Sequence, residues 1–87
     1  MTNAPHILVI DDEPSIVRSL SRILTDRGFE VSTAGSGQEG MALAAGLRPQ
    51  VVILDLRLPD GDGLPIIREI QKLDPAIRVI VITAFGD

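Results

Sequence analysis

Residues 51–63 read VVILDLRLPDGDG, and this stretch decides the fold. Its first four residues are all apolar, and an acid, Asp55, follows them directly. A short, unbroken apolar run of this kind is typical of a strand that is buried on both faces of a parallel sheet. The remainder is rich in Pro, Gly and Asp, which indicates a loop at the carboxyl end of the strand. We interpret Asp60 and Asp62 in this loop as turn-forming residues rather than ligands.

Two further apolar runs have the same form. Residues 7–10 (ILVI) are followed by Asp11 and Asp12, and residues 79–82 (VIVI) are followed by Thr83. Each run predicts a buried strand that ends at a polar side chain. In open parallel sheets, ligands bind beyond the carboxyl ends of the strands, so these polar residues mark a candidate site.

The segments between these runs complete an alternating pattern of strands and helices. Residues 29–33 also have the character of a strand, the second in chain order, and the other segments place apolar residues at helical spacing. The expected helix limits are marked by Pro14 and Gly28, by Ser36 with Glu39 and Gly46, and by Leu64 and Pro75. Alternation of this kind predicts right-handed crossovers and a parallel sheet covered by helices on both faces.

Composition narrows the classes of function. The net charge is -4 and the basic residues are scattered, which argues against direct contact with nucleic acid. Cysteine is absent, which excludes disulfides and thiolate metal sites and fits a cytoplasmic location. No apolar run is long enough to span a membrane, and residues 1–6 carry no export signal.

The three acids at strand ends indicate a metal site. Asp11, Asp12 and Asp55 repel one another when gathered at one edge of a sheet, so a cation or protons must offset their charge. Ligands that are all oxygen favour Mg²⁺. One carboxylate beside such an ion can attack a phosphorus atom and form an aspartyl phosphate, to which the Thr83 hydroxyl can donate a hydrogen bond.

Three blocks of the sequence resemble a known family. Residues 7–14 (ILVIDDEP), 51–63 and 79–85 (VIVITAF) are similar to the acid-pair, phosphoacceptor and threonine blocks of the response-regulator receiver domains of two-component signalling. The resemblance covers essentially the whole chain and implies a flavodoxin-like doubly wound parallel sheet. The sequences of residues 58–64 and 83–87 are most similar to those of receivers of nitrogen-regulatory-type transcription activators.

The resemblance implies roles for six residues around a bound Mg²⁺. Asp55 matches the phosphoacceptor. Asp12 and Asp55 match direct metal ligands, the Arg57 carbonyl matches a further metal ligand, and Asp11 matches an acid that acts through a metal-bound water. Thr83 matches the switch hydroxyl. The amides of Arg57 and Ala84 match the donors to the phosphoryl oxygens.

The chain departs from the family pattern at its carboxyl end. Residues 1–87 match the N-terminal portion of a receiver, truncated after the fourth strand, without the expected fourth helix, fifth strand and fifth helix. In the family the fifth strand ends in a lysine, and Lys72 is no substitute because it falls on the third predicted helix. We therefore expect the 87-residue chain to be phosphorylated poorly and to self-associate through the uncovered strand at residues 79–82.

The resemblance implies a signalling switch rather than a conventional enzyme. A sensor histidine kinase would phosphorylate Asp55, and the modification would regulate an output domain, of transcriptional type, that is absent from this chain. Two alternatives are a magnesium-dependent phosphatase with an aspartyl nucleophile and a scaffold that has lost its switch. Phosphatases of that type carry a second acid two residues after the nucleophile, whereas this chain has Arg57 at that position. Taken singly, Asp11 and Asp12 also suit a helix N-terminus, and Asp55 suits a turn.

Overall fold

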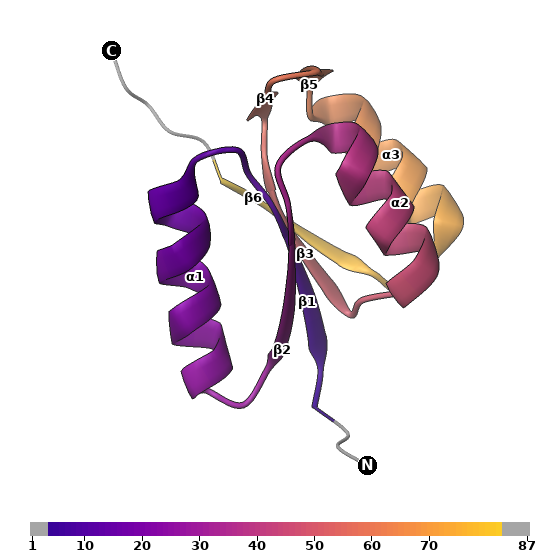
Figure 1. Ribbon diagram of the computed structural model, residues 1–87. Helices are drawn as coiled ribbons and strands as arrows, with labels where there is room; N and C mark the ends of the chain where they lie inside the picture. The colour runs from indigo at the N-terminus through magenta and orange to yellow at the C-terminus, as the bar shows by residue number, and fades with distance from the viewer. Residues whose placement is uncertain (1–3, 83–87) are drawn as a thin grey trace.

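A parallel four-stranded sheet with helices on both faces forms the domain (Figure 1). The structure is a computed structural model that describes residues 4–82. The sheet strands are β1 (His6–Ile10), β2 (Glu30–Ala34), β3 (Val51–Asp55) and β6 (Arg78–Ile82), in the spatial order β2-β1-β3-β6. The helices are α1 (Pro14–Asp26), α2 (Gly37–Leu47) and α3 (Leu64–Leu73). This order confirms the predicted flavodoxin-like doubly wound sheet.

The two faces of the sheet belong to two separate apolar clusters. Alternate residues of β1 and β3, such as Leu8 and Leu54, pack under α2 and α3 and are fully buried. The intervening residues, such as Val9 and Ile53, face α1 on the opposite side. Because successive side chains of a strand point to opposite faces, strands covered on both sides must be apolar at every position. The runs at residues 7–10 and 51–54 were therefore read correctly as buried strands, whereas the run at residues 79–82 forms a strand that is largely exposed.

Helix α2 begins where the sequence predicts and ends near the predicted residue. The Ser36 hydroxyl accepts a hydrogen bond from the Glu39 amide at 3.2 Å, which confirms the predicted N-cap. The helix continues past Gly46 to Leu47, and Arg48 closes it in the left-handed conformation with φ 48°. This end agrees with the one predicted near Gly46, although a non-glycine residue, Arg48, supplies the left-handed turn. No helix within residues 4–82 is long and apolar enough to cross a membrane.

The stretch after β3 is more ordered than the predicted loop. It holds a small antiparallel hairpin of two strands, β4 (Arg57–Leu58) and β5 (Gly61–Asp62). Leu58 is 8% exposed and joins the cluster under α2 and α3, so the hairpin is anchored in the core. Gly61 has φ 134°, a conformation that L side chains rarely adopt, and it allows the tight turn at the hairpin tip.

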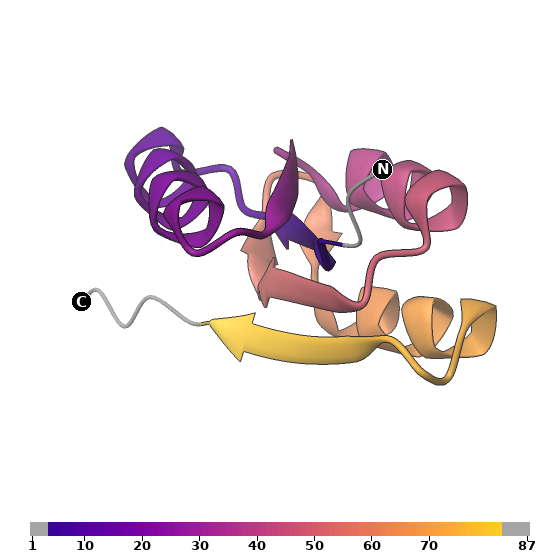
Figure 2. The same cartoon turned by 90° about the horizontal axis from the view of Figure 1, so that it is seen from below.

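Strand β6 forms one edge of the sheet, as Figure 2 shows. Among the described residues it pairs only with β3. Its central side chains are open to solvent, with Ile80 52% and Val81 41% exposed. An exposed apolar edge strand presents unpaired backbone groups that can pair with a second chain.

We expect the 87-residue chain to self-associate through β6, with the associated fraction rising over micromolar concentrations. The change Val81→Lys should weaken this association, because a charge at the centre of the edge opposes strand pairing. Leu64→Lys is the matched control, since Leu64 is 53% exposed but lies on α3. Light scattering behind size-exclusion chromatography measures the effect. A monodisperse monomer across that range would contradict this expectation.

Candidate functional site

Three carboxylates meet at the carboxyl edge of the sheet. Asp55 is the last residue of β3, and Asp11 and Asp12 directly follow β1. The two strands are parallel neighbours with Ile10 paired to Leu54, so the acids leave the sheet side by side. One carboxylate oxygen from each of the three acids lies within 4.8 Å of the others. The predicted convergence of these acids is therefore present in the structure.

Asp11 is the buried member of the cluster, with 2% of its surface exposed. Its Oδ1 accepts a hydrogen bond from the Glu13 amide at 2.9 Å, whereas its Oδ2 is buried without a hydrogen-bond partner. Burial raises the pKa of Asp11 above its ordinary value, and the charges of Asp55 and Asp12 raise it further against the opposing effect of the Glu13 amide. A buried carboxylate oxygen without a donor is costly, and a bound cation would satisfy it.

The other two acids open the cluster to solvent. Asp12 is exposed and Asp55 is half-buried. Asp55 Oδ1 accepts a hydrogen bond from the Arg57 amide at 3.1 Å, which fixes the orientation of the carboxylate relative to the following loop. Two accessible carboxylates beside a buried one allow an ion to keep several waters, as Mg²⁺ does. The donor set therefore fits Mg²⁺.

A cavity of about 280 Å³ lies beside the acid pair, between the first turn of α1 and the end of β2. Its lining residues are Asp11, Asp12, Pro14, Val17, Thr33, Ala34 and Gly35. The cavity is open to solvent, and Asp12, one of its lining residues, is exposed.

Helix capping does not account for the acid pair. The N-cap of α1 is Glu13, and its side chain makes no capping hydrogen bond. The amide that Asp11 accepts from belongs to Glu13 itself, outside the helix. Within residues 4–82, neither the Asp11 nor the Asp12 carboxylate accepts a hydrogen bond from an amide in the first turn of α1. The metal interpretation explains the pair better.

Of the remaining predicted site residues, the structure describes Arg57 but not Thr83 or Ala84. Arg57 is the first residue of β4, exposed, with its amide directed at Asp55. Thr83 and Ala84 lie outside the described residues. Lys72, which was not predicted as a site residue, lies in the last turn of α3, and its Nζ is 3.7 Å from a Glu69 carboxylate oxygen.

Gly63 makes a close backbone contact that sequence analysis did not identify. The Gly63 amide donates to the Leu56 carbonyl at 2.9 Å and closes the loop that carries Arg57. A Cβ atom at Gly63 would lie 2.8 Å from the Asp55 carbonyl oxygen, closer than such atoms approach. Only glycine therefore fits without moving the backbone of Asp55. The Asp-Gly pair indicated a turn, but nothing in the sequence indicated that the backbone of Asp55 is adjacent.

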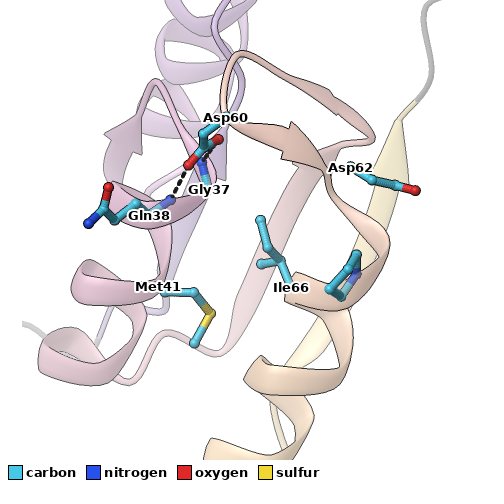
Figure 3. A pocket seen from close by; sticks show the side chains of 7 residues that line it. Gly37, Gln38, Met41, Asp60, Asp62 and Ile66 are labelled. Carbon is cyan, nitrogen blue, oxygen red and sulfur yellow. Dashed lines mark hydrogen bonds between the residues drawn. The ribbon is translucent and has the colours of Figure 1, made fainter.

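Asp60 also has a role beyond the turn. From the tip of the hairpin its carboxylate accepts two hydrogen bonds from the first turn of α2, from the Gly37 amide to Oδ1 and from the Gln38 amide to Oδ2, each at 2.9 Å (Figure 3). These two amide donors lower the pKa of Asp60 below its ordinary value. The contact lies at an open cavity of about 400 Å³ between α2 and α3 (Figure 3).

Comparisons with known proteins agree on one family. Residues 7–87 match the response regulator receiver domain. The chain is 40% identical over 87 residues to the transcriptional regulatory protein GlrR of Escherichia coli (strain K12), covering 99% of this chain and 20% of GlrR. It therefore spans about a fifth of the length of that relative.

Solved structures show the same fold. A CheY-like response regulator receiver domain protein from Methanospirillum hungatei JF-1 matches with a TM-score of 0.92 and 29% identity, over 98% of this chain and 68% of that one. A response regulator protein from Burkholderia pseudomallei, solved with a phosphorylated aspartic acid, a calcium ion and citrate, matches with a TM-score of 0.88 and 31% identity. That match covers 95% of this chain and 49% of the Burkholderia protein.

Proposed function

Because this chain belongs to the response regulator receiver family, whose members are signalling domains phosphorylated on an aspartate, we propose that it accepts a phosphoryl group on Asp55. The observation that carries the proposal is the convergence of Asp11, Asp12 and Asp55, with carboxylate oxygens within 4.8 Å of one another. Asp55 is the last residue of the central strand β3, and its carboxylate accepts a hydrogen bond from the Arg57 amide. The matched Burkholderia protein carries a phosphorylated aspartic acid and a calcium ion.

We propose that Asp12, Asp55 and the Arg57 carbonyl bind Mg²⁺ directly and that Asp11 acts through a water. Receiver domains bind Mg²⁺ at an acidic cluster of this kind. The unpartnered Asp11 Oδ2 and the all-oxygen donor set support this assignment. When bound, the ion supplies positive charge that offsets the charge of the three acids and of the incoming phosphoryl group.

The protein groups carry out the transfer. A carboxylate oxygen of Asp55 attacks phosphorus, forming the new O–P bond as the bond from phosphorus to the donor breaks. The Arg57 amide holds the carboxylate in place before attack. We assign the Thr83 hydroxyl and the amides of Arg57 and Ala84 to the phosphoryl oxygens, on the resemblance of residues 79–85 to the threonine block of the family.

The partners follow from the same assignment. We propose a sensor histidine kinase as the phosphodonor, in the cytoplasm, and an output of transcriptional type carried by sequence outside this chain. GlrR is a transcriptional regulatory protein, and this chain aligns with only 20% of it. The domain itself acts as a regulator and makes no direct contact with nucleic acid, in keeping with its net charge of -4.

Small-molecule phosphorylation tests the function directly. Long incubation with acetyl phosphate and Mg²⁺ should add one phosphoryl group to a fraction of the chain, seen in the intact mass, and pretreatment with EDTA should prevent the addition. Addition of the group in the absence of any divalent cation would contradict the proposal.

Mg²⁺ binding should depend on the acid pair. We expect the chain to bind Mg²⁺ with a dissociation constant of about the millimolar range, and Asp12→Ala to abolish binding, because it removes an exposed direct ligand. Titration followed by amide NMR should shift the signals of residues 11–13 and 55–57. Asp26→Ala is the control, since Asp26 is an exposed acid at the far end of α1. Unshifted signals near Asp12 and Asp55 in the parent chain would refute the metal site.

A further inference from the structure

The Asp60 carboxylate joins two parts of the chain that are distant in sequence. It leaves the tip of the β4–β5 hairpin and accepts hydrogen bonds from the Gly37 and Gln38 amides, each at 2.9 Å, in the first turn of α2. Figure 3 shows both bonds, and it shows Asp62 of the same hairpin directed away from this contact. Each carboxylate oxygen therefore bonds to its own backbone donor, and the hairpin tip is attached to the helix at two points.

The surrounding packing is built for this attachment. A Cβ atom at Gly37 would collide with Ile66 of α3 and would lie 3.3 Å from Asp60 Oδ1. A side chain at this position would therefore require the end of the Ile66 side chain to move and would crowd the Asp60 carboxylate. The N-cap function for α2 is already supplied by Ser36, whose hydroxyl accepts from the Glu39 amide. The hydrogen bonds to Asp60 thus add to the cap that Ser36 supplies, and they connect α2 to the β4–β5 hairpin.

The hairpin leads directly from this attachment to the acidic site. Asp60 occupies the turn between β4 and β5. In this hairpin, Arg57 pairs with Asp62 and Leu58 pairs with Gly61. The amide of Arg57 donates to Asp55 Oδ1 at 3.1 Å. A short paired hairpin transmits the position of its tip to its base, because its strands cannot slide without losing their hydrogen bonds. Leu58 fixes the hairpin to the core on one side, and Asp60 fixes its tip to α2.

We propose that Asp60 is a positioning residue for phosphorylation of Asp55: by attaching the hairpin tip to the first turn of α2, it holds the Arg57 backbone in place beside the Asp55 carboxylate. The inference rests on the proposed function of Asp55. It adds a residue that contacts neither metal nor phosphoryl group and acts only through the hairpin. Outer groups that orient a metal or phosphoryl ligand commonly have a measurable effect on affinity and rate.

The charge of Asp60 supports this role. The Gly37 and Gln38 amides lower the pKa of Asp60, so the side chain is a carboxylate at neutral pH and offers both oxygens as acceptors. It also lies at the positive end of the α2 dipole, which favours a negative group. An amide side chain offers only one acceptor oxygen and presents a donor to the second amide, so it should keep part of the attachment.

The test compares Asp60→Ala and Asp60→Asn with Ser36→Ala. Ser36→Ala removes a hydrogen bond from the same end of α2 but leaves the hairpin attached, so it controls for loss of helix stability. Three quantities are measured: the Mg²⁺ dissociation constant, the rate of phosphorylation by acetyl phosphate at saturating Mg²⁺, and hydrogen exchange at the Arg57 amide. We expect Asp60→Ala to lower the phosphorylation rate about tenfold and to speed exchange at Arg57. Asp60→Asn should lie between Asp60→Ala and the parent chain, and Ser36→Ala should match the parent in rate and in Arg57 exchange.

The outcomes separate this inference from the proposed function. Absence of Mg²⁺-dependent phosphorylation in the parent chain even after long incubation would refute the function of Asp55. A phosphorylated parent chain with an Asp60→Ala variant of equal rate and equal Arg57 exchange would refute only the positioning role. Equal losses in Asp60→Ala and Ser36→Ala would also refute it, because the effect would then come from α2 stability. If Asp60→Ala does not fold, the graded loss expected for Asp60→Asn against Ser36→Ala decides the question.

Discussion

Replacing Asp55 with asparagine is expected to abolish phosphorylation of the chain by acetyl phosphate in the presence of Mg²⁺. The amide has nearly the same shape as the carboxylate but lacks the anionic oxygen that attacks phosphorus. The fold should be retained, because Asp55 is only half-buried and its removal relieves repulsion among three clustered acids. Intact-mass spectrometry before and after treatment with hydroxylamine, which cleaves acyl phosphates, measures the modification.

Asp26→Asn is the matched control for this change, since it also removes one negative charge but lies at the end of α1. It should be phosphorylated like the parent chain. Because the resemblance predicts weak phosphorylation of these 87 residues, the comparison should use long incubation and report the fraction modified. Modification of the Asp55→Asn variant to the parent level would place the phosphoryl group on another residue and overturn the assignment.

The largest loss of stability is expected from Leu54→Ala. Leu54 is fully buried in β3, under α2 and α3, immediately before Asp55. Truncation of such a side chain removes buried apolar area and leaves a cavity, which costs about 2–5 kcal/mol. Since domains are stable by only about 5–15 kcal/mol, this change should remove a large part of the free energy of unfolding. Urea denaturation followed by far-ultraviolet circular dichroism measures the shift of the midpoint.

Leu64→Ala is the control, because the same atoms are removed from a side chain that is 53% exposed. Its free energy of unfolding should stay within about 0.5–1 kcal/mol of the parent value. Leu54→Met, which nearly conserves volume, should cost less than about 1.5 kcal/mol. Similar midpoints for Leu54→Ala and Leu64→Ala would contradict the packing described for β3.

The sequence by itself determined the architecture and the acidic cluster. Unbroken apolar runs at residues 7–10 and 51–54 can be stable only in strands covered on both faces, which requires helices on each side of a parallel sheet. Parallel strands carry the residues that follow them to one edge, so Asp11, Asp12 and Asp55 had to approach one another once β1 and β3 were neighbours. These conclusions rest on local periodicity and on general rules of chain connection, whereas the order of the strands in the sheet was expected from the resemblance to receiver domains.

Tertiary structure alone decided the contacts made by the loop after Asp55. The sequence PDG predicts a turn, but the partner of the Asp60 carboxylate, the first turn of α2, lies more than twenty residues earlier in the chain. Gly63 likewise reads as a turn residue, whereas its necessity comes from the Asp55 carbonyl oxygen packed against it. Both contacts depend on how closely α2, α3 and the hairpin approach over the sheet. That approach is set by the combined shapes of side chains from several elements, which no local pattern of residues records.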